Sequence, residues 1–145
     1  MAEKGAYAYD YPRPMVTVDA VVLSMREGKR HVLLIRRGRP PFEGAWALPG
    51  GFVGIDEPLE TAAERELAEE TGLTGVALRQ LHTFGDPGRD PRGRSISVVY
   101  WGEAPADAAV MGGDDAAEAG WFPLDALPPL AFDHAKVVEY LVEVG

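Results

Sequence analysis

The chain has 145 residues, a formal net charge of −9 and no cysteine. This length suits one hydrophobic core, so we expect a single domain over residues 1–145, in which residues 1–14 form an N-terminal extension. The lack of cysteine excludes disulfides, thiolate metal sites and a cysteine nucleophile. The negative charge disfavours nucleic acid as a partner, and no apolar run has the roughly 18 residues needed to cross a membrane. These features predict a cytoplasmic protein with a small-molecule partner.

Short apolar segments rich in β-branched and aromatic residues are typical of strands. We expect strands, in chain order, at residues 15–24, 31–37, 46–48, 76–84 and 95–101, with a further short apolar piece at 121–124. A turn at residues 26–29 predicts that the first two strands form a hairpin. The Ala-, Asp- and Gly-rich segment 104–119 is predicted to be a loop.

Two segments predict helices. The first covers residues 58–70 and ends at Gly72, which suits the left-handed position after a helix. The second covers residues 134–143, with Asp133 as a good N-cap residue and an apolar stripe on one face. Because strands and helices mix without strict alternation, the fold class is predicted to be α/β, with a mixed sheet covered by helices.

The first helix carries three carboxylates that follow a helical spacing. Glu66, Glu69 and Glu70 stand at i, i+3 and i+4, so they repel one another and oppose the helix dipole. A cation between the carboxylates would remove both penalties. The alternative is a solvated acidic face, which is the usual explanation of a glutamate-rich helix.

The context of this helix favours a metal site. It follows Pro49-Gly50-Gly51, whose glycines allow a backbone carbonyl to approach a ligand, and Arg65 lies where it can orient a carboxylate. Carboxylates, a carbonyl and an open side suit Mg²⁺, which takes oxygen ligands and retains several waters, with Mn²⁺ as a possible substitute. The pattern therefore predicts a phosphoryl or pyrophosphoryl site.

A longer motif surrounds these residues. Gly51, Glu57 after five further residues, and the run Arg65-Glu66-Leu67-Ala68-Glu69-Glu70-Thr71-Gly72-Leu73 after seven more together resemble the signature box of the Nudix hydrolases. The resemblance implies a Nudix-type α/β/α sandwich with a mixed β-sheet, and metal-dependent hydrolysis of a nucleoside diphosphate linked to another group. It also implies roles for the box residues: Glu66, Glu69, Glu70 and the Gly50 carbonyl as metal ligands, with Gly51, Glu57 and Arg65 in support.

The group that accepts a proton from the attacking water lies outside what the box defines. Family members often place it on a loop before a short aromatic strand, and here that loop carries Asp115 and Glu118 ahead of Trp121. Glu69 of the box is an alternative base. Acidic loop residues are also commonly just solvated.

Positive charge suited to phosphates or a ribose gathers in two places. The loop of residues 82–95 carries Arg89, Arg92 and Arg94, and the second strand ends in Arg36 and Arg37. Because neighbouring strand residues point to opposite faces, one member of the second pair is expected to face the site. A solvated turn-rich loop is the alternative for the first group.

Three tyrosines, Tyr7, Tyr9 and Tyr11, alternate in the N-terminal segment. They could stack on a base, cover an edge of the core, or contact a second subunit in a homodimer. His134 is expected to be a first-turn helix residue and not a metal ligand, since imidazole is a poor partner for Mg²⁺.

Three functions fit these residues. The first is hydrolysis of ADP-ribose or a related nucleotide sugar to AMP and a sugar phosphate. It is suggested by the sequences of residues 36–51, 89–92 and 132–134, which resemble those of the ADP-ribose pyrophosphatase branch of the Nudix family. The second is a nucleoside triphosphate or dinucleoside polyphosphate pyrophosphatase, which uses the same box. The third is a non-catalytic nucleotide-sugar-sensing domain, which the complete set of box carboxylates disfavours.

Overall fold

A computed structural model describes residue 5, residues 7–113 and residues 116–144. Within this part the elements follow one another as β1 (Met15–Arg26), β2 (Lys29–Arg37), β3 (Trp46–Ala47), β4 (Gly50–Phe52), α1 (Leu59–Thr71), β5 (Arg79–Phe84), β6 (Ser95–Glu103), β7 (Ala116–Pro123) and α2 (His134–Val144).

The β1–β2 hairpin and the end of α1 both follow local sequence. Residues Glu27 and Gly28 have φ values of 51° and 76°, so a two-residue turn with two left-handed positions joins the strands,. Gly72 has a φ of 75° and donates its N–H to the carbonyl of Ala68, which ends α1 as predicted,.

The sheet is mixed, as predicted. Its main path runs β3-β2-β1-β6-β5, while β4 pairs with β1 and β7 pairs with β2. The pair β1·β6 is parallel and the other pairs are antiparallel. Residues 17–24 of β1 are all buried, because helices cover this central strand on both faces,.

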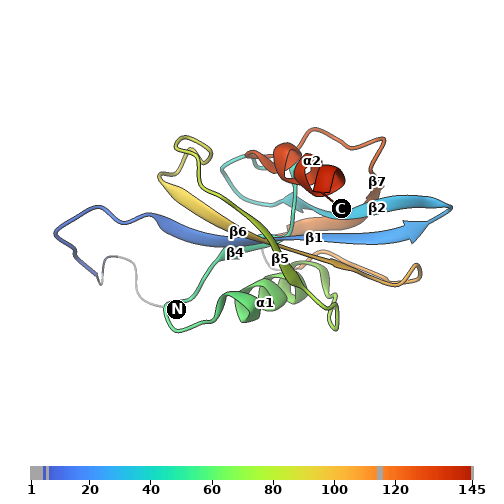
Figure 1. The fold of residues 1–145 in the computed structure, drawn as a ribbon, viewed down its shortest axis with the longest axis horizontal. Coiled ribbons are helices and arrows are strands. Elements are labelled where there is room, and N and C mark those ends of the chain that lie inside the picture. The colour runs from blue at the N-terminus through green and yellow to red at the C-terminus, as the bar shows by residue number, and fades with distance from the viewer. Residues whose placement is uncertain (1–4, 6, 114–115, 145) are drawn as a thin grey trace.

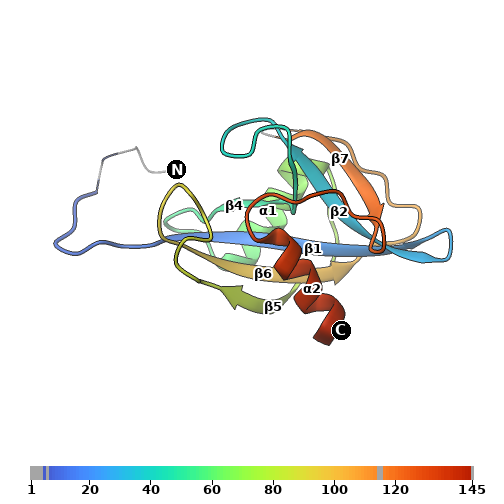
Figure 2. The same cartoon turned by 90° about the horizontal axis from the view of Figure 1, so that it is seen from above.

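The helices lie on opposite faces of the sheet, which makes the α/β/α sandwich (Figure 1). On one face, α1 packs Ala62, Ala63 and Leu67 against residues of β1 that include Val18 and Val22. On the other face, α2 packs against alternate β1 residues, and Figure 2 shows it crossing above β1 and β6. The contacts in this second layer include Val137, Val138, Leu141, Val21 and Leu23.

The two central antiparallel strands separate along their length. Strands β1 and β2 pair over Leu23–Arg26 and Lys29–Val32, next to the hairpin turn. Further from the turn, β1 pairs with β4 while β2 pairs with β3 and β7. The segment from β3 to β4 therefore fills a wedge between β1 and β2, which places the glycines of the box in the middle of the sheet.

Strands β1, β2 and β6 extend two residues beyond their predicted ranges, and three segments differ more from the sequence prediction. The strand expected at 76–84 starts at Arg79, where pairing with β6 begins. The loop predicted at 104–119 is wrong at its end, because β7 starts at Ala116 and pairs with β2. Gly50–Phe52 forms a strand by pairing with β1. Each difference arises from pairing between distant segments, which outweighs local preference.

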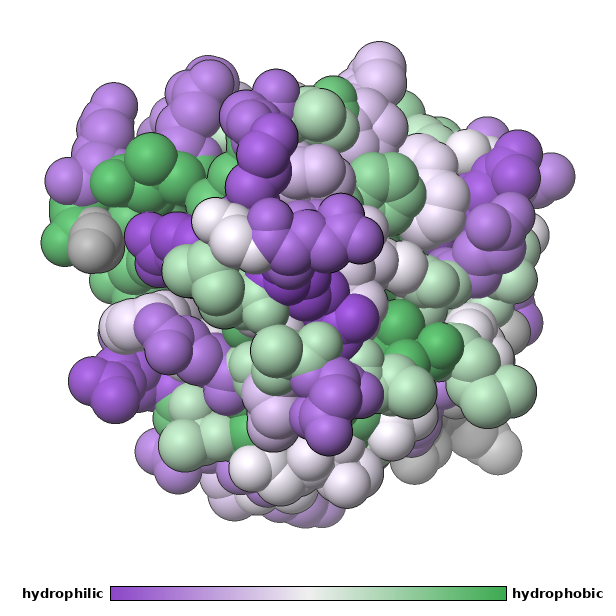
Figure 3. Space-filling model, turned by 90° about the vertical axis from the view of Figure 1, so that its right-hand side faces the viewer, coloured by the Kyte–Doolittle hydropathy of each residue, from purple (hydrophilic) through white to green (hydrophobic). Residues whose placement is uncertain are grey.

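The surface at the hairpin end mixes hydrophilic and hydrophobic residues. Figure 3 views the molecule from this end and shows polar side chains lying between small apolar areas. Within the described residues, neither helix has the length and apolar character to cross a lipid bilayer.

Candidate functional site

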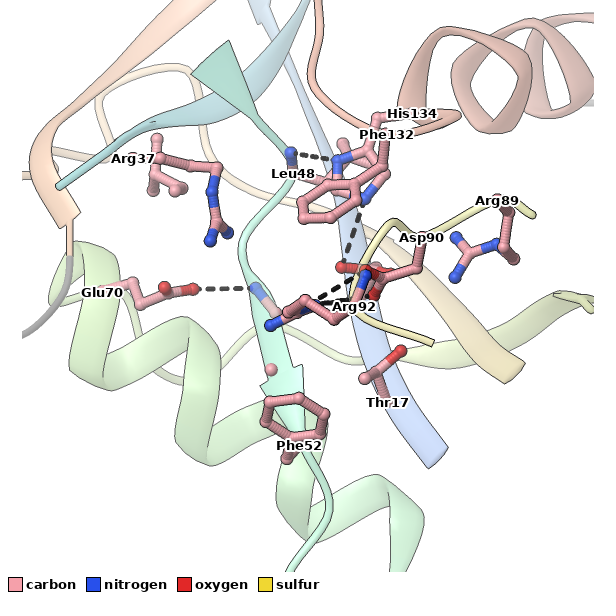
Figure 4. Close-up of a pocket in the computed structure, with 14 residues that line it drawn as sticks. Thr17, Arg37, Leu48, Phe52, Glu70, Arg89, Asp90, Arg92, Phe132 and His134 are labelled. Atoms are coloured by element: carbon pink, nitrogen blue, oxygen red, sulfur yellow. Dashed lines mark hydrogen bonds and ion pairs between the residues drawn. The ribbon is translucent and has the colours of Figure 1, made fainter. Parts of the chain in front are cut away.

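Two adjoining cavities open in the wedge between β1 and β2. One has a volume of about 370 Å³ and the other about 60 Å³. Both are bordered by the same seven residues: Ile35, Arg37, Gly50, Gly51, Phe52, Glu70 and Arg92. They form one cleft with an acidic side on α1 and a basic, aromatic side opposite it (Figure 4).

Glu70 forms the inner part of the acidic side. It comes from the last turn of α1, is 7% exposed, and accepts the N–H of Gly50 at 2.7 Å. Burial raises the pKa of the Glu70 carboxyl to about 8, and the nearby charges of Glu66 and Asp19 add to this effect,. Glu66, one turn earlier on the same face, borders the larger cavity, and burial also raises its pKa.

Arg65 forms ion pairs with three carboxylates of the box. Its Nε and Nη2 atoms donate to Glu57 at 2.6 and 2.9 Å, and its Nη1 donates to Glu66 at 2.9 Å and to Glu69 at 3.2 Å. The Arg65 guanidinium holds the pKa of the Glu57 carboxyl at about 2. It also pairs with Glu69, whose side chain is 39% exposed.

The structure thus brings Glu66 and Glu70 to the cleft but leaves Glu69 outside its lining. No group of three or more acidic or histidine residues in the described chain is arranged to hold a metal ion. The chemistry of the two lining carboxylates nevertheless fits a divalent cation, which takes oxygen ligands and would neutralise the charge repulsion that adds to the effect of burial on the Glu70 pKa,.

The glycine at position 51 makes room for this acidic side. A Cβ atom at Gly51 would lie 2.6 Å from Oε1 of Glu66, closer than real Cβ contacts allow. Only glycine therefore lets the Glu66 carboxylate lie against the backbone of β4.

The opposite side of the cleft combines arginines with aromatic rings. The Arg92 guanidinium lies 4.9 Å from the ring centroid of Phe52 and 5.4 Å from that of Phe132, and Arg37 lies 5.0 Å from Phe132. Asp90, 5% exposed, orients Arg92 through an Nη2–Oδ2 contact of 2.8 Å. Burial and the charge of Arg92 lower the pKa of Arg37. This side can contact phosphates and a flat aromatic group.

The other predicted arginines have different surroundings. Arg89 borders the smaller cavity, but its guanidinium is held by Asp133 and Ser95. Arg94 donates to the carbonyl of Gly85, and Arg36 pairs with Glu118; neither arginine borders the two cavities. Of the pair on β2, Arg37 therefore faces the cleft.

Of the two base candidates predicted in the loop before Trp121, Glu118 lies within the described residues and belongs to β7. Asp115 lies outside the described residues. Glu118 is exposed, pairs with Arg36 at 3.1 Å and does not border the cleft. The preceding segment contacts α1, since Met111 donates its N–H to Thr71 and a Cβ at Gly113 would lie 2.6 Å from the carbonyl of Glu69.

Several residues of the cleft were not predicted from sequence as site residues. They are Thr17, Asp19, Phe52, Asp90, Phe132 and His134. Asp19 carried a signal, because a carboxylate interrupts the otherwise apolar run of β1. His134 starts α2 as predicted, and it lies at the base of the smaller cavity. The carboxylate of Asp133, predicted as an N-cap, instead accepts hydrogen bonds from Arg89.

Comparison with known proteins identifies this arrangement. A family profile described as NUDIX domain matches residues 14–141. The chain belongs to the Nudix family. This confirms the resemblance of the box and the predicted sandwich, and it supports the predicted pyrophosphohydrolase activity on phosphorus-containing anhydrides.

Two curated relatives are similar over most of this Nudix chain. An ADP-ribose pyrophosphatase of Methanocaldococcus jannaschii is 43% identical over 89% of the chain and 73% of the relative. The ADPR-responsive transcriptional repressor NtrR of Acinetobacter baylyi is 38% identical over 90% of the chain, which spans 54% of that repressor.

Solved structures share the fold. The Nudix domain of Shewanella oneidensis NrtR, complexed with ADP-ribose, has a TM-score of 0.87 and 36% identity, covering 94% of this chain and 93% of that one. A bifunctional NMN adenylyltransferase/ADP-ribose pyrophosphatase of Francisella tularensis, complexed with AMP and a manganese ion, has a TM-score of 0.81 and 30% identity. The match covers 94% of this chain and 43% of that protein.

Proposed function

We propose that this Nudix protein hydrolyses the diphosphate linkage of ADP-ribose or a related nucleotide sugar, giving AMP and a sugar phosphate. One observation carries the proposal: the carboxylates of Glu66 and Glu70 share a cavity with the guanidinium groups of Arg37 and Arg92 and the exposed ring of Phe52. A nucleotide sugar presents two phosphates between two flat or polyhydroxylated groups, and this cleft offers matching chemistry. The named relatives that act on or bind ADP-ribose support the choice of substrate.

In this proposal Glu66, Glu69, Glu70 and the Gly50 carbonyl hold Mg²⁺, with Mn²⁺ as a substitute. The cation neutralises charge that develops on the phosphates and lowers the pKa of an attacking water. Arg65, which contacts both Glu57 and Glu66, would orient the Glu66 carboxylate towards the cation. Gly51 leaves the space in which Glu66 lies.

Arg37 and Arg92 would orient the diphosphate from the opposite side, and Asp90 keeps Arg92 directed into the cleft. Phe52 would lie against the base or sugar. We assign the other predicted arginines, Arg36, Arg89 and Arg94, at most an indirect part in binding, because their guanidinium groups are held by other residues.

The proton of the attacking water would pass to a carboxylate at the end of α1 or in the segment before β7. Glu69, Asp115 and Glu118 are the three to compare. A pH profile of turnover for each single glutamine or asparagine variant would identify the base, because its loss removes the acidic limb of the profile.

The test of function is release of product from ADP-ribose, other nucleotide sugars, dinucleoside polyphosphates and nucleoside triphosphates, with Mg²⁺, with Mn²⁺ and with a chelator. We expect preference for ADP-ribose and loss of activity with the chelator. Preference for triphosphates or dinucleoside polyphosphates would contradict the choice of substrate while keeping the reaction.

An ADP-ribose-sensing domain is the second candidate. It is favoured by the similarity to the Nudix domain of NrtR, a protein also solved with a 27-mer DNA over a match that covers 61% of its chain. Calorimetric binding of ADP-ribose with no metal-dependent turnover would select this candidate.

We also propose a single-domain homodimer acting in the cytoplasm. Tyr7, Tyr9 and Tyr11 are 53%, 49% and 80% exposed, which leaves their rings available to a second copy,. Sedimentation of the wild-type protein and of a variant with all three tyrosines changed to serine tests the dimer.

A further inference from the structure

A row of buried polar groups links the start of α2 to the β3–β4 segment. His134 is 4% exposed, Asp19 is 8% exposed and Ser97 is fully buried. Figure 4 shows His134 directed from α2 towards Leu48 and into the base of the cleft. The row runs from α2 to Asp19 on β1 and on to Ser97 on β6, and two of its members, His134 and Asp19, border the smaller cavity together with Gly50 and Glu70.

His134 accepts a hydrogen bond from the backbone of Leu48. Its Nδ1 lies 3.0 Å from the Leu48 nitrogen, in a buried position. Because the backbone N–H of Leu48 can only donate, Nδ1 carries no proton and the ring is neutral; burial, which lowers the pKa of His134, favours the same state,. The ring proton must then be on Nε2, which faces Oδ1 of Asp19 at 3.6 Å,.

Asp19 is fixed in turn from the far side. Its Oδ2 accepts the hydroxyl hydrogen of Ser97, which lies on the parallel neighbour strand β6. The hydrogen bond from Leu48 fixes the tautomer of the His134 ring, and the Asp19 carboxylate lies opposite its Nε2 as an electrostatic partner,.

The backbone of residues 48–50, which His134 contacts, is also fixed by hydrogen bonds and close packing from other elements. The carbonyl of Pro49 accepts the N–H of Ala20 at 2.9 Å, and the N–H of Gly50 donates to Oε1 of Glu70 at 2.7 Å. A Cβ at Gly50 would lie 2.3 Å from Oδ1 of Asp19, so the backbone packs directly on this carboxylate. Leu48 is the last residue before Gly50 with an N–H, because Pro49 has none.

We propose that His134, supported by Asp19 and Ser97, is a positioning residue that sets the direction of the Gly50 carbonyl and of the Glu70 carboxylate. The inference rests on the proposed function, in which both groups bind the cation. Rotation of the Leu48–Gly50 backbone would turn the Gly50 carbonyl and move the N–H that holds Glu70. The helix on the opposite face of the sheet from α1 therefore contributes to the geometry of the acidic side.

The experiment compares His134→Gln with His134→Asn. The carboxamide oxygen of asparagine reaches the position of Nδ1 and keeps an acceptor for Leu48, whereas glutamine extends towards the position of Nε2 and loses it. His82→Gln is the matched control, since His82 is exposed and stacks on Tyr140 at 4.3 Å. Binding of Mn²⁺ alone, measured by electron paramagnetic resonance, is the readout that does not depend on turnover.

We expect His134→Gln to weaken Mn²⁺ binding at least about tenfold. This is the lower end of the loss in metal affinity that follows mutation of residues that orient metal ligands. Its kcat should fall with little change in KM, because the guanidinium groups of Arg37 and Arg92 are held by Pro41 and Asp90 rather than by His134. His134→Asn should restore Mn²⁺ binding to within about threefold of wild type, and His82→Gln should leave it unchanged.

Wild-type Mn²⁺ affinity in His134→Gln would overturn the inference even if the variant unfolds more easily. Failure of the wild-type protein itself to bind Mn²⁺ would overturn the proposed function and the inference with it. Should His134→Gln not fold, Ser97→Ala is tested instead, with an expected loss of about threefold in affinity. Unchanged affinity in Ser97→Ala would then overturn the inference.

Discussion

The guanidinium of Arg89 and the carboxylate of Asp133 form a buried two-point contact, with Nη2–Oδ1 at 2.6 Å and Nε–Oδ2 at 3.0 Å. Their side chains are 6% and 16% exposed. The contact joins the loop before β6 to the residue that precedes α2. It thereby holds Arg92 and His134, one from each segment, beside the same cleft.

Arg89→Leu should lower the free energy of unfolding by at least about 2 kcal/mol, because it leaves the Asp133 carboxylate without its partner in a largely buried position. Urea unfolding measures this loss. The control is Lys29→Met, which breaks the Lys29–Asp125 pair of 61% and 64% exposure and should change stability by less than about 1 kcal/mol,. Equal effects of the two variants would contradict a structural role for the Arg89 pair.

Glu70→Gln should lower turnover at least about a hundredfold, the scale of losing one group that stabilises charge during the reaction. The fold should remain, because the amide oxygen of glutamine can still accept the N–H of Gly50. Glu64→Gln, an exposed position on the same helix, is the control and should keep its activity. Near-normal turnover in Glu70→Gln would refute the metal assignment.

Gly51→Ala should reduce turnover by about a hundredfold, the scale expected when a reacting group is displaced by 1 Å. The new Cβ would lie 2.6 Å from Glu66 and must push its carboxylate out of the cleft. Gly85→Ala is the control, because its Cβ would meet Ile96 at an ordinary 3.6 Å. Steady-state kinetics of both variants at saturating metal measure the difference, and equal activities would count against the assigned position of Glu66.

His134 should make stability depend on pH on the acidic side. Burial lowers its folded-state pKa below the ordinary 6.5, although the charge of Asp19 opposes this shift. Below about pH 6.5 the unfolded chain binds a proton that the folded chain excludes, so the free energy of unfolding falls by up to about 1.4 kcal/mol per pH unit. Above that pH, this residue adds no slope.

Urea unfolding of wild type and His134→Asn between pH 5 and 8 measures this contribution. The difference in unfolding free energy between the two proteins should be constant above pH 7. Below pH 7 the wild type should lose stability relative to the variant. A difference that stays constant down to pH 5 would show that His134 is not excluded from protonation.

Local sequence was sufficient for the hairpin and for the end of α1. The turn at Glu27 and Gly28 and the left-handed position of Gly72 depend on the backbone freedom of a few neighbouring residues,. The apolar stripe of α2 likewise follows from helical spacing alone. These features could be predicted because the interactions that form them lie within about one turn of the chain.

The composition of the box and the family also followed from the order of residues. The arrangement of the site did not. β4 exists because β1 pairs with it, and the cleft forms because β1 and β2 separate beyond the hairpin. Glu69 pairs with Arg65 and does not border the cleft, and His134 contacts Leu48 across 86 positions of sequence. Such contacts depend on how distant segments pack, a property that the spacing of residues along one segment does not encode.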